Sequence, residues 1–171
     1  SVTGKVCLDI GASTGGFTDC LLQYGASKVY AVDVGYGQFD WRLRQDSRVV
    51  VIERTNIRHM PYEQINERVD VIVADTSFIS LKTVIPSAEK FMKENATVLA
   101  LIKPQFEAGK KYVGKGGVVK DPEIREKVKK DLTLFFKERG YKVNSIVPSP
   151  ILGPKGNKEY ILFLNFLKKI K

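Results

Sequence analysis

The chain has 171 residues, of which 43% are hydrophobic, and this length is enough to bury one substantial core. Its formal net charge of +9, with a sequence pI near 9.5, favours a polyanionic partner. No apolar run approaches the roughly 20 residues that span a bilayer. Two cysteines, Cys7 and Cys20, provide neither a disulfide framework nor a metal site. We therefore expect a single domain over residues 1–171, without bound metal, in a reducing, cytoplasmic environment.

Apolar segments alternate with helix-forming segments, which predicts a mostly parallel α/β sheet covered by helices on both faces. We expect strands at about 5–10, 28–34, 49–53, 69–74, 97–102, 142–147 and 159–167. We expect helices at about 16–24, 39–44, 81–93 and 122–140, and a loop rich in glycine and lysine at 106–117. A Pro/Gly-rich hairpin at 148–157 joins the last two of the seven strands, so the final strand should be antiparallel.

Residues 8–16 read Leu-Asp-Ile-Gly-Ala-Ser-Thr-Gly-Gly, which predicts a strand, a glycine-rich turn and a helix. Asp33 follows 22 residues after Gly11, at the end of the second apolar run. This layout is typical of a nucleoside-binding unit, in which the second carboxylate accepts hydrogen bonds from a ribose diol. The alternative is that Asp9 and the glycines merely end a strand and begin a helix.

The details of this turn indicate which nucleoside it binds. Its glycines do not have the Gly-x-Gly-x-x-Gly spacing of a dinucleotide site, and Asp9 at the strand tip would repel a phosphate. A carboxylate there suits an ammonium group, so S-adenosylmethionine, which has a ribose but no phosphate, fits better. The fold class that follows is a Rossmann-like methyltransferase. The predicted cofactor-binding residues are Asp9, Gly11, Ala12, Ser13, Thr14, Gly15, Gly16, Phe17, Asp33, Val34, Thr55, Asn56 and Asp75.

Three further residues are expected at the edge of the sheet where ligands of open α/β folds bind. Asp75 and Lys103 follow the fourth and fifth strands, and Glu159 begins the antiparallel last strand, so all three should converge. Because the sulfonium methyl is already activated, the protein must align a hydroxyl acceptor and remove its proton. Lys103 would be the base or its partner, with Asp75 and Glu159 orienting it. Taken singly, the three could instead be a helix cap, a solvated strand end and an edge-strand charge.

Five blocks of the sequence resemble the TlyA/haemolysin A family of FtsJ-like ribose 2′-O-methyltransferases. They are residues 9–18, 31–38, 75–80, 102–107 and 156–159, and the resemblance covers nearly the whole chain. It implies methylation of a cytidine 2′-hydroxyl in ribosomal RNA, so rRNA or ribosomal subunits would be the partners. It also implies a Lys-Asp-Lys-Glu tetrad, of which Asp75, Lys103 and Glu159 would be the last three members.

The sequence departs from the family pattern at its beginning. The family's first catalytic lysine lies in an Arg-Gly-Gly-x-Lys-Leu segment upstream of the first strand, and an S4-type RNA-binding domain precedes that segment. Neither occurs here, since residue 1 stands just before the first strand. We therefore expect an isolated methyltransferase domain that keeps cofactor binding but lacks activity and much of the RNA affinity.

Three other functions remain open. Asp75-Thr-Ser-Phe78 has the Asp-x-x-aromatic frame of enzymes that methylate an exocyclic amine of a flipped base, although the usual prolines between are missing. The family's older name suggests a membrane-active haemolysin, but no amphipathic lysine-rich helix with a wide apolar face is evident. The third possibility is a nucleic-acid-binding module without catalysis.

Overall fold

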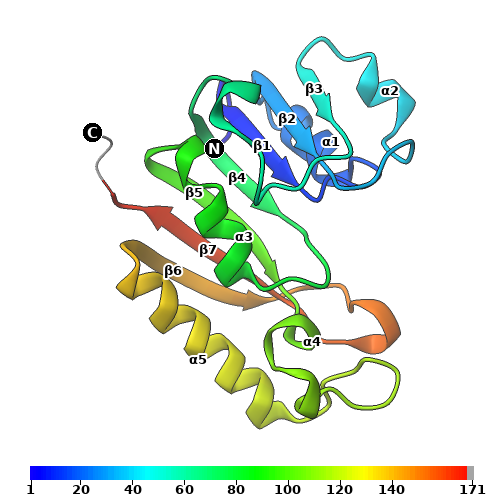
Figure 1. The fold of residues 1–171 in the computed structure, drawn as a ribbon, viewed down its shortest axis with the longest axis vertical. Helices are drawn as coiled ribbons and strands as arrows, with labels where there is room; N and C mark the ends of the chain where they lie inside the picture. Colours follow the sequence, from blue (N-terminus) through cyan, green and yellow to red (C-terminus); the bar gives the residue numbers. More distant parts are fainter. Residues whose placement is uncertain (169–171) are drawn as a thin grey trace.

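The computed structural model describes residues 1–168 and contains a seven-stranded sheet of order β3-β2-β1-β4-β5-β7-β6 (Figure 1). The strands are β1 (Val6–Ile10), β2 (Lys28–Val32), β3 (Val49–Ile52), β4 (Val69–Ala74), β5 (Met92–Ile102), β6 (Tyr141–Pro148) and β7 (Tyr160–Phe166). The first five strands are parallel, and β7 pairs antiparallel with both β5 and β6. The predicted fold, with its antiparallel last strand, is confirmed. Residues 169–171, which include Lys169 and Lys171, lie outside the described residues.

Helices lie on both faces of the sheet. They are α1 (Gly16–Gln23), α2 (Trp41–Arg44), α3 (Leu81–Ser87), α4 (Pro104–Glu107) and α5 (Pro122–Glu138), with 3-10 turns η1 (Tyr62–Gln64), η2 (Glu89–Phe91), η3 (Lys110–Tyr112) and η4 (Pro154–Gly156). Apolar residues of α3 and α5 pack on one face, and α1 packs on the other against alternate side chains of the same strands (Figure 1). In β1 and β4, successive side chains therefore enter different hydrophobic clusters.

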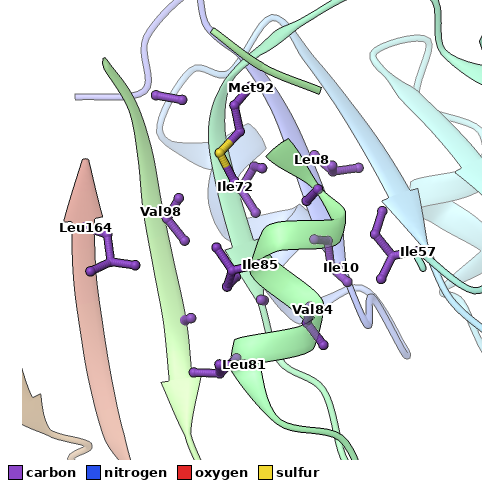
Figure 2. Packing of buried hydrophobic residues seen from close by; sticks show 14 of the residues in the cluster. Leu8, Ile10, Ile57, Ile72, Leu81, Val84, Ile85, Met92, Val98 and Leu164 are labelled. Atoms are coloured by element: carbon purple, nitrogen blue, oxygen red, sulfur yellow. The ribbon is translucent and has the colours of Figure 1, made fainter. Parts of the chain in front are cut away.

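The core under α3 fixes the central strands. Figure 2 shows Val84 and Ile85 of α3 among Ile10 of β1, Ile72 of β4 and Val98 of β5, all of them buried. Burying one such side chain contributes roughly 1.5–3 kcal/mol. This packing holds the carboxyl ends of β1, β4 and β5 in a fixed arrangement, and these ends carry the site.

Three predicted elements are wrong in their extent. The helix expected over 81–93 ends at Ser87, because Pro86 supplies no backbone N–H and Phe91 and Met92 are fully buried against the sheet. β5 consequently begins at Met92 instead of near 97. The loop expected over 106–117 overlaps helix α4, whose first residue is Pro104, a residue that favours the first turn of a helix.

Candidate active site

A cavity of about 520 Å³ opens at the carboxyl edge of the sheet, where β1, β2 and β4 end. Its volume is in the range of small-molecule sites. Seven of the predicted cofactor-binding residues line it, namely Gly11, Ser13, Asp33, Val34, Thr55, Asn56 and Asp75. Other lining residues were not predicted to bind the cofactor, among them Gln38, Ile57, Thr76, Ser77, Ile79 and Val84, and Phe78 of the alternative function also lines the cavity.

The glycine turn is shaped by two close approaches. Gly11 has a positive φ of 79°, and a Cβ there would collide with the backbone carbonyl of Asp75. Gly15 has a φ of 104°, and a Cβ there would collide with the side chain of Leu43. Glycine is therefore required at Gly11 to bring the ends of β1 and β4 together, and at Gly15 to admit the segment around α2.

Asp33 connects the glycine turn to the end of β2. One carboxylate oxygen accepts a hydrogen bond from the Ser13 backbone N–H at 2.7 Å, and the other accepts from the Gly35 N–H at 2.9 Å. Ser13 has a positive φ of 53°, a conformation that its bond to Asp33 stabilises. Since a carboxylate has about four lone-pair sites, Asp33 keeps acceptor capacity toward the cavity.

Asp9 lies behind the cavity wall and does not line it. Its side chain is fully buried, and Oδ2 accepts a hydrogen bond from the Thr18 hydroxyl at 2.8 Å. Oδ1 has no hydrogen-bond partner among residues 1–168. Burial raises the pKa of Asp9 to about 6, an effect that the Thr18 hydrogen bond opposes. The contact of Asp9 with a ligand ammonium group remains a prediction.

The remaining predicted cofactor-binding residues belong to the glycine turn and the start of α1 but do not line this cavity. Ala12 is buried in a small cluster with Phe39, and Phe17 is exposed on α1. Thr14, Gly15 and Gly16 line a separate hollow together with residues of α2. Their part in cofactor binding also remains a prediction.

Asp75 and Lys103 meet at the rim of the cavity, although 28 positions separate them in the sequence. Lys103 Nζ forms an ion pair with Asp75 Oδ1 at 2.6 Å and donates a hydrogen bond to Ser77 Oγ at 3.3 Å. The Lys103 side chain is only 12% exposed, while that of Asp75 is 36% exposed. The ends of two adjacent parallel strands thus hold a carboxylate and an amine in direct contact.

Glu159 lies one residue before β7, beside the end of β5. Tyr160 pairs with Ile102 in the antiparallel register. The residue before Tyr160, which is Glu159, is therefore opposite the residue after Ile102, which is Lys103. The Glu159 side chain is buried, and Oε2 accepts a hydrogen bond from Gln105 Nε2 at 3.2 Å. Within the described part of the chain, Lys103 pairs with Asp75 and not with Glu159, so Gln105 holds the second carboxylate.

Glu107 is a further site residue that was not predicted, whereas Phe78 belongs to the Asp-x-x-aromatic frame of the alternative function. Glu107 accepts hydrogen bonds from the Ser80 hydroxyl and the Leu81 N–H, and burial raises its pKa. Phe78 is 89% exposed and has a positive φ of 63°, which is uncommon for an aromatic residue. Its ring lies 4.8 Å from that of Phe106. All these residues lie in the blocks 75–80 and 102–107, whose resemblance to the family could have identified them as site residues.

No described helix is both long and apolar enough to cross a bilayer. Across residues 1–168, His, Cys, Asp and Glu side chains do not gather in a group of three or more that could hold a metal ion.

Comparison with known proteins gives relatives over almost the whole chain. The 16S/23S rRNA (cytidine-2′-O)-methyltransferase TlyA of Mycobacterium tuberculosis is 51% identical over 164 residues, which are 96% of this chain and 61% of the relative. Hemolysin A of Brachyspira hyodysenteriae is 48% identical over 162 residues, covering 94% of this chain and 68% of that protein. The chain therefore spans about three fifths of the length of the M. tuberculosis relative.

Solved structures have the same fold. A chain from Streptococcus thermophilus superposes with a TM-score of 0.94 and 43% identity, over 99% of this chain and 62% of that one. The N-methyltransferase NodS of Bradyrhizobium japonicum superposes with a TM-score of 0.66 at 14% identity, over 97% of this chain and 88% of that one, and shows the fold alone. A model of the FtsJ-like methyltransferases matches residues 1–166. The chain thus belongs to the FtsJ-like methyltransferase family.

Proposed function

We propose that this chain is the catalytic domain of a methyltransferase that uses S-adenosylmethionine to methylate a cytidine ribose 2′-hydroxyl of ribosomal RNA. The observation that carries the proposal is the ion pair of Lys103 with Asp75 at the rim of the cavity. Membership of the FtsJ-like family and the activity named for the M. tuberculosis relative support it. The basic charge of the chain is consistent with an RNA substrate.

The residues of the cavity fit the proposed cofactor. Asp33 offers acceptor lone pairs for a ribose diol, and Gly11 leaves its backbone uncovered. Ile57 and Val84 provide apolar surface for a base. The Thr76 hydroxyl is buried without a partner among the described residues, so it can bond a polar ligand atom. When bound, the cofactor would supply an electrophilic methyl group.

Lys103 and its carboxylate neighbours would act on the acceptor hydroxyl. In its neutral form the Lys103 amine takes the proton from the 2′-hydroxyl, which leaves the oxygen as the nucleophile. Asp75 orients this amine through the 2.6 Å contact and stabilises the ammonium that forms. Glu159, which precedes β7 and is opposite Lys103 in the strand register, would add negative charge near this amine, and Gln105 fixes its direction. The rest of the barrier is reduced by alignment of the two reactants.

The proposal is tested in two steps, of which the first is binding. Titration calorimetry of S-adenosylmethionine and S-adenosylhomocysteine into the chain should show saturable binding of both. Absence of binding of both ligands would contradict a methyltransferase cavity in this chain.

The second step measures transfer of a labelled methyl group to ribosomal subunits. It is run on the chain and on a longer version containing the upstream lysine segment that the family resemblance implies. Lys103→Ala should reduce transfer by at least about 100-fold, and Lys142→Ala, which changes an exposed lysine of β6, should not. A methylated 2′-oxygen cannot attack the adjacent phosphate, so the product should resist alkaline cleavage at one position.

Methylation of an exocyclic base amine is the second candidate function. Phe78 favours it, because this exposed ring at the cavity is available to stack on a flipped base. In that reaction Lys103 has no required role. Retained transfer in Lys103→Ala, with a product that alkali cleaves normally, would establish this function instead.

A further inference from the structure

The segment between β6 and β7 presents two branched aliphatic side chains to solvent. Ile151 is 74% exposed and Leu152 is 61% exposed, and the two are consecutive. Pro150 and Pro154 flank them and restrict the backbone. Two adjacent aliphatic side chains exposed on one short loop form a local apolar surface, which a partner that covers it would remove from water.

This tip is held firmly beside the candidate active site. The Gly153 N–H donates to the Asn157 carbonyl at 2.7 Å, and the Ser149 N–H donates to the Glu159 carbonyl at 2.9 Å. A Cβ on Gly153 would collide with the Glu159 carboxylate, so the backbone of the tip lies directly against this side chain. Leu152 and Glu159 also line one shared cavity of about 430 Å³. The tip therefore has a fixed position relative to Glu159.

Asn157 fastens the tip to the loop that is rich in glycine and lysine. Its buried side chain accepts a hydrogen bond from the Val119 N–H at 3.1 Å and donates to the Gly117 carbonyl at 2.9 Å. Gly116 lies near the end of the Lys155 side chain, since a Cβ added to Gly116 would be 3.8 Å from Lys155 Nζ. The exposed basic residues of the two loops are Lys110, Lys111, Lys115, Lys120, Lys155 and Lys158. Lys155 and Lys158 follow the apolar tip closely in the chain, and Asn157 joins this loop to the other lysine-bearing loop.

We propose that Ile151 and Leu152 form an apolar wedge that enters an RNA duplex and fills the space left by an extruded nucleotide. The lysines of the two loops would neutralise the flanking phosphates. This inference rests on the proposed function, because extrusion brings a paired nucleotide to a cavity at the edge of the protein. Proteins that kink duplexes insert aliphatic side chains between base steps in this way, and the lysines of the two loops favour a polyanion as the occupant.

The experiment compares two RNA probes of 20 base pairs, one intact and one with a single abasic site in the middle. The abasic duplex provides a ready space for the wedge without requiring knowledge of the target sequence. The unsubstituted chain should bind the abasic duplex about tenfold more tightly than the intact one. The double variant Ile151→Ser with Leu152→Ser should reduce this ratio to about one. Leu134→Ser, which changes an equally exposed leucine on α5, should leave the ratio unchanged.

The lysines provide an independent readout. Lys155→Ala with Lys158→Ala should weaken binding of both duplexes equally and reduce the salt dependence of binding, while the abasic preference remains. Titration of S-adenosylhomocysteine into each variant shows whether the fold and the cofactor cavity are intact. A failure of the proposed function would abolish that titration in the unsubstituted chain, whereas a failure of the wedge alone would leave it intact.

Three outcomes would overturn the wedge. The first is equal binding of the two duplexes by the unsubstituted chain. The second is a preference for the abasic duplex that the double serine variant retains. The third is binding to vesicles of anionic lipid that the double serine variant abolishes, while its ratio of duplex affinities is unchanged. The last result would assign the tip to a membrane surface.

Discussion

Glu107 accepts a hydrogen bond from the Ser80 hydroxyl at 2.6 Å, and this bond joins two segments that are 27 residues apart. The same carboxylate accepts a second bond at 2.8 Å from the Leu81 N–H, at the start of α3. Ser80 ends the segment that begins at Asp75, and Glu107 ends α4, which begins one residue after Lys103. The bond therefore holds together the two segments that carry the Asp75–Lys103 pair.

Replacing Glu107 should destabilise this junction. Glu107→Ala leaves the Ser80 hydroxyl and the Leu81 N–H without their acceptor, so the free energy of unfolding should fall by about 2–3 kcal/mol. Glu107→Gln keeps one acceptor oxygen and should lower it by about 1 kcal/mol. Urea unfolding followed by circular dichroism measures both values. Equal losses for the two variants would show that the hydrogen bonds are not the cause.

The buried Asp9 predicts a pH dependence of stability with a definite sign. Its pKa is raised from 3.8 to about 6, so between about pH 4 and 6 the folded chain binds a proton that the unfolded chain has released. Stability from this group is therefore greatest at low pH and decreases as the pH rises through this window. The decrease should reach roughly 3 kcal/mol by pH 7, at about 1.4 kcal/mol for each pKa unit.

Asp9→Asn tests this prediction, because asparagine keeps an acceptor for Thr18 but does not titrate. The free energy of unfolding of each protein is measured in urea at several pH values from 4 to 7. The difference between the two proteins should change by roughly 3 kcal/mol over this range in favour of the variant. Parallel curves would mean that Asp9 ionises normally in the folded chain.

The sequence predicted the sheet edge and the meeting of Asp75 with Lys103, because parallel strands bring their carboxyl ends to one side whatever their separation in the chain. It did not predict the supporting contacts. Gln105 and Glu107 lie on a single turn of helix, and their partners Glu159 and Ser80 are distant in sequence. The length of α3 was overestimated for a related reason, since the tertiary burial of Phe91 and Met92, together with Pro86, ends the helical segment early.

Asp33 should be essential for binding of the cofactor. Asp33→Ala removes the acceptors that hold the backbone N–H groups of Ser13 and Gly35 and also removes those proposed for the ribose diol. We expect the dissociation constant of S-adenosylhomocysteine to rise by at least about 100-fold. Asp131→Ala, which changes an exposed aspartate of α5, serves as the control and should bind normally. Unchanged affinity in Asp33→Ala would remove this carboxylate from the proposed site.

A substitution at Gly153 can displace the Glu159 carboxylate without changing its chemistry. Gly153 has φ −78° and ψ −171°, which alanine adopts without strain, so the backbone tolerates Gly153→Ala. The added Cβ would nevertheless collide with the Glu159 carboxylate and displace it from Gln105. We expect methyl transfer by the longer version to fall about tenfold or more, while binding of S-adenosylhomocysteine is unchanged, because neither residue lines the cofactor cavity.

A double-mutant cycle with Glu159→Gln shows whether this effect passes through the carboxylate. If Gly153→Ala acts by displacing Glu159, it should reduce transfer strongly in the unsubstituted protein and only slightly in the Glu159→Gln background. Independent effects would multiply instead, and they would indicate that Gly153 acts on RNA binding through the neighbouring Ile151 and Leu152. The abasic-duplex ratio of Gly153→Ala separates these two cases, because displacement of Glu159 alone leaves that ratio unchanged.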